Sequence, residues 1–120
     1  MSSTTTTTYS AILCSLLNHR WEERGLTQRD FFAQTGIASG TWSRMVRGLA
    51  HFHIEDLRAA CEVLGWSVGE ITTEADRVSR ALKEQEKVKI PSKADLRAND
   101  GAPMGYFVAG AALAFLLSRL

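Results

Sequence analysis

Two cysteines and three histidines are the side chains of this sequence best suited to covalent or metal chemistry. Cys14 and Cys61 each lie in a segment of periodic apolar residues, and the sequence has neither a disulfide framework nor a secretion signal. His51 and His53 are one residue apart, but a metal site needs further ligands at suitable spacing. Neither His19 nor the cysteines supply them in a recognisable motif. We therefore expect two buried free thiols and no metal site.

Motifs for catalysis are missing from the sequence as well. It contains no Ser/His/Asp or Cys/His arrangement and no glycine-rich loop of the kind that binds phosphates. A chain of 120 residues is also too short for a barrel enzyme or a dinucleotide-binding enzyme. We expect no catalytic activity and no cofactor.

Net charge restricts how this chain can bind an acidic partner. The sequence has 14 Lys and Arg residues against 13 Asp and Glu residues, which gives a formal net charge of +1. A nearly neutral chain does not hold nucleic acid by bulk charge, so any such binding requires a local basic face. The apolar and charged fractions, 45% and 22%, are ordinary for a folded globular domain.

Apolar residues recur at helical spacing in the first part of the chain, and no stretch alternates as a strand would, so we predict an all-α fold. A first helix starts at Tyr9 and ends near Gly25. Its apolar stripe consists of Tyr9, Ile12, Leu13, Leu16 and Leu17. A second helix starts at Thr27, which forms a capping box with Asp30, and ends at Gly36.

Three further short helices are predicted before residue 72. The third begins around residue 38 or 39 and ends at Gly48. The fourth covers about residues 54–64, and its inward residues are Ile54, Leu57, Ala60, Cys61 and Leu64. The fifth begins at a second capping box, formed by Ser67 and Glu70.

The order and spacing of these helices resemble the lambda-repressor-like (Cro-repressor, XRE) helix-turn-helix family. The residues that carry the resemblance are Thr27, Gln28, Phe31, Gly36, Ile37, Thr41, Trp42, Ser43, Arg44 and Gly48. The resemblance covers about residues 9–72 and implies a five-helix domain there that binds double-stranded DNA. In such a domain the second helix crosses the phosphate backbone, and the third lies in the major groove.

The resemblance also implies a role for individual residues. Gln28 corresponds to the usual phosphate contact, and Arg47 to a contact with the DNA backbone. The positions that face the groove are Ser39, Gly40, Thr41, Ser43 and Arg44. Arg44 is the natural base reader among them, because a guanidinium group can bridge O6 and N7 of one guanine. The positions that match inward-facing ones are Ile37, Trp42 and Met45.

Three residues depart from the family pattern. Phe32 stands where the family packs a small residue, which can change how the second and third helices cross. Ala38 replaces the usual Ser or Thr cap, so we expect Ser39 to cap the third helix instead. Thr35 replaces an apolar residue.

Residues 73–101 are rich in charge and predict an amphipathic helix followed by a linker. The narrow apolar seam of this helix consists of Ile71, Ala75, Val78 and Leu82. Such a seam either pairs two copies of the chain or packs on its own domain. A homodimer is attractive because one domain of this family usually reads only a half-site.

The two ends of the chain have their own composition. Residues 1–8 are polar and are expected to form a mobile leader. Residues 102–118 carry no charge and predict an apolar helix. We favour a membrane span for that helix, which would attach a cytoplasmic domain to the bacterial inner membrane. The alternative is a helix buried in an assembly, which would leave the protein cytoplasmic.

The leading functional interpretation is a repressor-like transcriptional regulator that binds DNA sequence-specifically as a dimer. It includes the option of a membrane tether through residues 102–118. One alternative is a membrane-anchored adaptor that uses its helix-turn-helix domain to bind protein. Another is an antitoxin-type repressor whose C-terminal helix is covered by a partner.

Overall fold

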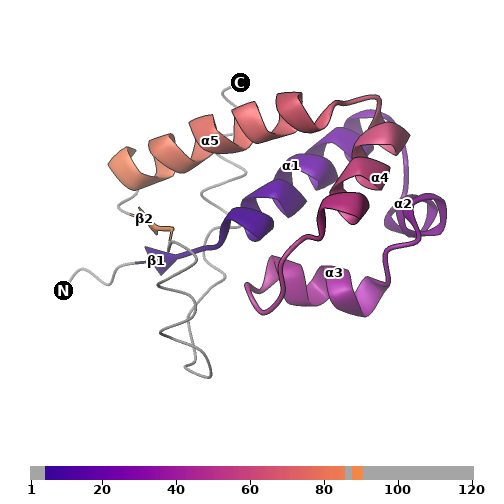
Figure 1. Cartoon of the computed structure of the whole chain (residues 1–120), viewed down its shortest axis with the longest axis horizontal. Helices are drawn as coiled ribbons and strands as arrows, with labels where there is room; N and C mark the ends of the chain where they lie inside the picture. The colour runs from indigo at the N-terminus through magenta and orange to yellow at the C-terminus, as the bar shows by residue number, and fades with distance from the viewer. Residues whose placement is uncertain (1–4, 86–87, 91–120) are drawn as a thin grey trace.

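The helix α1 (Tyr9–Glu23) lies at the centre of the domain and contacts each of the other four helices. A computed structural model describes residues 5–85 and 88–90, and Figure 1 shows their arrangement. The other helices are α2 (Gln28–Thr35), α3 (Ser39–Val46), α4 (Ile54–Leu64) and α5 (Val68–Gln85). Within the described residues the fold is therefore all-α with five helices, as predicted. In Figure 1, α3 and α5 lie on opposite sides of α1.

The central position of α1 follows from its apolar sequence. The predicted stripe is confirmed, because Ile12 and Leu17 are fully buried and Leu13 and Leu16 are nearly so. Ala11, Cys14 and Trp21 are buried as well, so α1 is covered around most of its circumference. Such a helix needs other helices on several sides, which α3, α4 and α5 provide.

The predicted helix ends are confirmed where they rest on local capping. The Asp30 backbone N–H donates to the Thr27 hydroxyl oxygen at 3.1 Å, and the Thr27 N–H donates to the Asp30 carboxylate at 3.3 Å. Ser67 and Glu70 form the equivalent pair before α5, at 3.0 Å in both directions. Gly65 ends α4 in the left-handed conformation. Each box satisfies backbone donors that a helix start leaves free.

One inward residue of α4 was predicted wrongly. Leu57 and Cys61 are buried, but the Ile54 side chain is 61% exposed. Ile54 follows the N-cap residue His53 directly and precedes Leu57 by almost one turn. Ile54 lies on the same face of α4 as Leu57 and Cys61. It is in the first turn, however, which precedes the part of the helix that reaches the core.

The fifth helix and the amphipathic helix predicted after it form one continuous helix, α5. The seam residues Ile71, Ala75 and Leu82 are 0% exposed and Val78 is 2% exposed. They pack on α1 and α4, so the seam covers its own domain, which is the second of the two alternatives. It is not available to pair two copies of the chain.

Part of the expected leader belongs to the domain. Residues Thr5–Thr6 form a short strand β1, which pairs in parallel with β2 (Val88–Lys89). Thr7 and Thr8 are 1% exposed, and the Thr8 hydroxyl accepts the Ala11 N–H at 3.0 Å as the N-cap of α1. The expectation of a mobile leader is therefore wrong for residues 5–8, where a distant backbone partner and a local cap fix the chain. Residues 1–4 lie outside the described residues.

Two predicted segments fall largely or wholly outside the described residues. These are the linker after α5, of which only residues 88–90 are described, and the apolar segment 102–118. Among residues 5–85 and 88–90, no helix is both long and apolar enough to cross a membrane.

A hydrogen bond from Tyr9 fastens the start of α1 to α5. The Tyr9 hydroxyl group lies 2.9 Å from Oδ1 of Asp76 and 3.1 Å from the backbone oxygen of Thr72. Burial raises the pKa of Tyr9 from 10.0 to about 12, and the hydrogen bond to Asp76 adds to this rise. The neutral phenol is thus the form that the folded state prefers.

Replacing Tyr9 with Phe should lower the free energy of unfolding by about 1 kcal/mol at neutral pH, because one hydrogen bond to a carboxylate is lost. Since folding raises the pKa of this phenol, its contribution is complete below pH 10 and is lost as the pH rises towards 12. The stability gap between wild type and Tyr9→Phe should therefore close between pH 10 and 12. Urea unfolding of both proteins along this pH series measures the gap. A gap that stays constant contradicts the role given to Tyr9.

Candidate nucleic-acid interface

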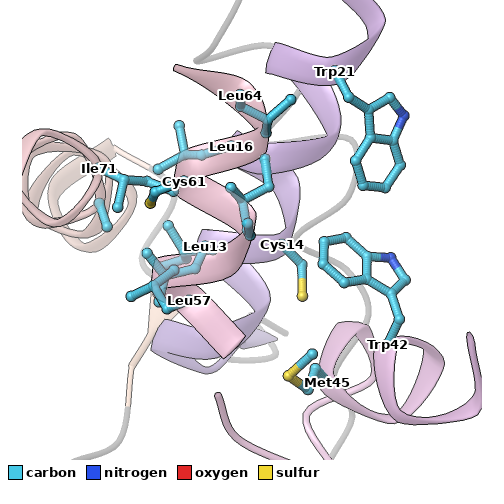
Figure 2. Packing of buried hydrophobic residues seen from close by; sticks show 14 of the residues in the cluster. Leu13, Cys14, Leu16, Trp21, Trp42, Met45, Leu57, Cys61, Leu64 and Ile71 are labelled. Carbon is cyan, nitrogen blue, oxygen red and sulfur yellow. The ribbon is translucent and has the colours of Figure 1, made fainter. Parts of the chain in front are cut away.

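A cluster of aromatic rings packs α3 against the rest of the domain. Trp42 of α3 is 4% exposed, and its ring centroid lies 5.2 Å from that of Trp21 and 5.5 Å from that of Phe31. Figure 2 shows Trp42 and Met45 projecting from α3 towards α1, where they meet Cys14 and Trp21. The predicted inward positions of α3 are therefore confirmed, as is Ile37 in the preceding turn, at 4% exposure.

The opposite face of α3 is open to solvent. Because Trp42 and Met45 point inward, helical periodicity turns the residues between and around them outward. The predicted groove-facing residues Ser39, Gly40, Ser43 and Arg44 are all exposed, and Thr41 is half-buried. Gln28 and Arg47 are exposed as well. The structure thus brings the predicted residues to the surfaces of α2, α3 and the residue after α3, and their contacts with DNA stay a prediction.

The turn between α2 and α3 is held by its own hydrogen bonds. Gly36 ends α2 with a φ of +78°, and its N–H donates to the Phe32 carbonyl at 2.9 Å. The Thr35 hydroxyl donates to the Phe31 carbonyl at 2.9 Å and accepts the Ile37 N–H at 3.2 Å. Thr35, which departs from the family pattern, therefore replaces an apolar contact with two hydrogen bonds that brace the turn.

The start of α3 differs from the prediction. The N-cap is Ala38, which offers no side-chain hydrogen bond, and Ser39 is the first residue of the helix. Ser39 does not take over the cap, because its backbone is already helical, whereas a capping residue needs an extended backbone. No side chain caps the first turn of α3, so its N–H groups remain able to donate to an external acceptor.

Two of the five arginines between residues 19 and 48 serve the fold. Arg20 stacks over the Trp66 ring at 4.5 Å, and Arg24 donates to the Leu64 carbonyl at 2.5 Å. The sequence alone does not distinguish these two arginines from the other three. Only their contacts in the folded structure do.

The remaining three arginines lie between the start of α2 and the residue that follows α3. Arg29, Arg44 and Arg47 are exposed, and residues 28–47 contain one acidic residue, Asp30, which the capping box engages. Nε of Arg47 donates to the Ser43 carbonyl at 3.3 Å, which holds this side chain along α3. Arg29 is not among the residues predicted from the sequence to contact DNA, although its position next to Gln28 in the first turn of α2 is a usable signal.

Phe32 extends the aromatic cluster. Its ring centroid lies 5.8 Å from that of Trp42 and 6.3 Å from that of Trp21, and the residue is half-buried. The large residue is therefore accommodated between α2 and the rings of α1 and α3. The predicted change in helix crossing stays a prediction.

Comparison with protein families identifies a matching family. A family model described as a helix-turn-helix domain matches residues 13–73, just over half of the 120 residues. The chain belongs to this helix-turn-helix family. The family lies within the lambda-repressor-like group, as the sequence resemblance indicated. Comparisons with curated proteins and with solved structures return no significant match.

The helix-turn-helix assignment gives α2 and α3 their roles in the motif. The matched region begins within α1 and ends within α5, so it contains the whole aromatic cluster and the exposed face of α3. In this motif the second helix, here α3, is the recognition helix. Membership of a DNA-binding family points to DNA binding and transcriptional regulation, and such domains are typically not enzymes.

The two cysteines of the helix-turn-helix domain lie in its core and not on the exposed face of α3. Cys14 and Cys61 are free and buried, as predicted, and burial raises the pKa of both thiols. His53 is the N-cap of α4 but makes no side-chain capping hydrogen bond. Among the described residues, no group of three His, Cys, Asp or Glu side chains could hold a metal ion.

Gly36 has a left-handed backbone and Gly40 a helical one, so we predict opposite effects on stability for Gly→Ala substitutions at these two positions. A Cβ at Gly36 or at Gly40 would meet no heavy atom within 4 Å, so neither change creates a clash. Gly36→Ala should cost roughly 1–2 kcal/mol because of its positive φ. Gly40→Ala should stabilise by about 0.5–1 kcal/mol because Gly40 lies inside a regular helix. Chemical denaturation measures both, and equal effects of the two changes contradict the backbone account of the turn.

Proposed function

We propose that this protein is a sequence-specific, repressor-like regulator that binds double-stranded DNA through α3. The observation that carries the proposal is the division of α3 into two faces. One face is packed into the aromatic cluster, and the other presents an arginine, hydroxyl groups and a glycine to solvent. This is the composition expected of a helix that reads base edges in the major groove.

Arg44 is the proposed base reader. Its side chain is exposed on the same face as Ser43, and its guanidinium group can donate to O6 and N7 of one guanine. Thr41 and Ser43 can donate to bases or phosphates, and Gly40 lets the backbone approach the groove closely. The uncapped first turn at Ser39 adds backbone donors near a phosphate.

The phosphate contacts are proposed at the two ends of the motif. Gln28 and Arg29 lie in the exposed first turn of α2, where the helix dipole favours an anion. Arg47 follows α3 and is braced against it by its bond to Ser43. These contacts fix the register of the protein on DNA, while α3 supplies specificity.

The proposed mechanism is occupancy of an operator. One helix-turn-helix domain covers a half-site, so a dimer would cover two half-sites about 34 Å apart. A protein bound in this way blocks or redirects polymerase. The membrane tether, the adaptor function and the antitoxin function depend on residues 102–118, outside the described residues, and stay predictions from the sequence.

Duplexes selected from a random pool by the full-length chain test this proposal. Arg44→Ala should lose about 1–3 kcal/mol of preference for the selected sequence over a scrambled one, because a bidentate base contact is removed. Arg47→Ala should weaken binding to both duplexes alike and should lower the slope of log affinity against log salt concentration by about 1.

Arg80→Ala is the matched control, because Arg80 is an exposed arginine on α5, across α1 from α3. It should leave both the affinity and the sequence preference unchanged. Circular dichroism checks that each variant is folded. Selection that enriches no sequence, or an Arg44→Ala protein with an unchanged preference, refutes the proposed function.

A further inference from the structure

A buried polar side chain at the start of α1 faces the connection between α3 and α4. Ser10 is 7% exposed and lies in a helix whose other buried residues are hydrophobic. Its Oγ accepts the backbone N–H of Phe52 at 3.1 Å, although the two residues are 42 positions apart in the chain. Because a buried hydroxyl group without a partner is costly, this hydrogen bond accounts for a polar residue at this place in α1.

Phe52 links this hydrogen bond to α3. Its ring centroid lies 6.1 Å from that of Trp42, and the two rings meet edge to face with an angle of 82° between their planes. Trp42 is the residue whose packing in the aromatic cluster holds α3 on the domain. The Ser10 hydroxyl group therefore holds the backbone of a residue whose ring contacts the buried side of α3.

The two ends of the connection between α3 and α4 are fixed in different ways. Near α3, the Leu49 N–H donates to the Arg44 carbonyl at 2.7 Å, which ties the connection to α3 itself. Near α4, His53 is the N-cap residue but makes no side-chain capping hydrogen bond. The bond from Phe52 to Ser10 ties this second end to α1, and Figure 1 shows the start of α1 next to the connection.

We propose that Ser10 is a positioning residue for DNA recognition, because its hydroxyl group, through Phe52 and Trp42, sets the angle at which α3 enters the major groove. The inference rests on the proposed function, since the contact that Ser10 positions is the base contact of Arg44. Such a contact tolerates little displacement, because a binding group must be held within roughly 0.5 Å and 10–20° of its productive geometry. Ser10 is buried on α1 and acts through α3 rather than by touching DNA.

The preceding residue, Tyr9, offers a matched comparison. Both side chains lie in the first turn of α1, and each makes a hydrogen bond to a distant part of the chain. The Tyr9 hydroxyl group bonds to α5, on the opposite side of α1 from α3, whereas Ser10 bonds to the connection that follows α3. Loss of either bond weakens the fold, but only loss of the Ser10 bond changes how α3 is held.

Binding of the full-length chain to the selected and the scrambled duplex, at neutral pH and well below the unfolding temperature, tests this role. Ser10→Ala removes the acceptor but introduces a good helix former, so the domain still folds. It should lower the preference for the selected duplex about tenfold, because a displaced Arg44 loses much of its bidentate base contact. The slope of log affinity against log salt concentration should not change, because the phosphate contacts remain. Tyr9→Phe should leave both the preference and the slope unchanged.

A double-mutant cycle with Arg44 separates positioning from a general loss of stability. In the Arg44→Ala protein, Ser10→Ala should cost little further preference, because the contact that Ser10 positions is already gone. Equal preferences of the Ser10→Ala and Tyr9→Phe proteins, or a full tenfold loss from Ser10→Ala in the Arg44→Ala protein, overturn the positioning role. Arg44→Ala alone tests the proposed function. A loss of preference in Arg44→Ala without one in Ser10→Ala therefore refutes the role of Ser10 and leaves the proposed function intact.

Discussion

The indole ring of Trp42 lies 5.2 Å from Trp21 and 5.5 Å from Phe31, and the position of α3 depends on this packing. An isolated helix of eight residues is not stable in water, and α3 lacks a side-chain cap at its start. Its helical form must therefore come from burying Trp42 and Met45 against α1 and α2. The same burial turns Arg44 and Ser43 to solvent. The helical form of α3 and the exposure of the proposed interface therefore both follow from the burial of Trp42 and Met45.

The rest of the domain supports α1, on which this packing depends. Figure 2 shows aromatic residues on the α3 side of α1 and aliphatic residues, among them Leu13, Leu57 and Ile71, near α4 and α5. The bond from Tyr9 to Asp76 and the pairing of β1 with β2 then fasten both ends of the described chain to each other and to α5. The exposed face of α3 is thereby left without any covering element among the described residues.

The features predicted correctly from the sequence are those set by interactions between residues close in the chain. The capping boxes at Thr27 and Ser67 and the helix ends at Gly36 and Gly65 depend on residues close in the chain, and all are confirmed. The exposure of Ile54 depends on where the core ends. The conformation of residues 5–8 depends on a strand partner more than eighty residues away. Periodicity alone does not contain that information.

The candidate surface was partly predictable for the same reason. Helical spacing and the family resemblance separate inward from outward residues of α3, and the structure agrees at each of Ile37, Trp42 and Met45. Composition does not tell which arginines are available, because Arg20 and Arg24 are engaged by Trp66 and Leu64 from α4 and the turn after it.

The central claim is that the outer face of α3 is the surface that meets DNA. The most direct measurement is a nuclear magnetic resonance titration of the isotope-labelled full-length chain with a selected duplex. We predict that the backbone signals of residues 39–44 and of Gln28 and Arg29 shift with salt-sensitive affinity. Signals of exposed α5 residues such as Arg77 should stay in place. Shifts confined to α5, with α3 unaffected, contradict this account.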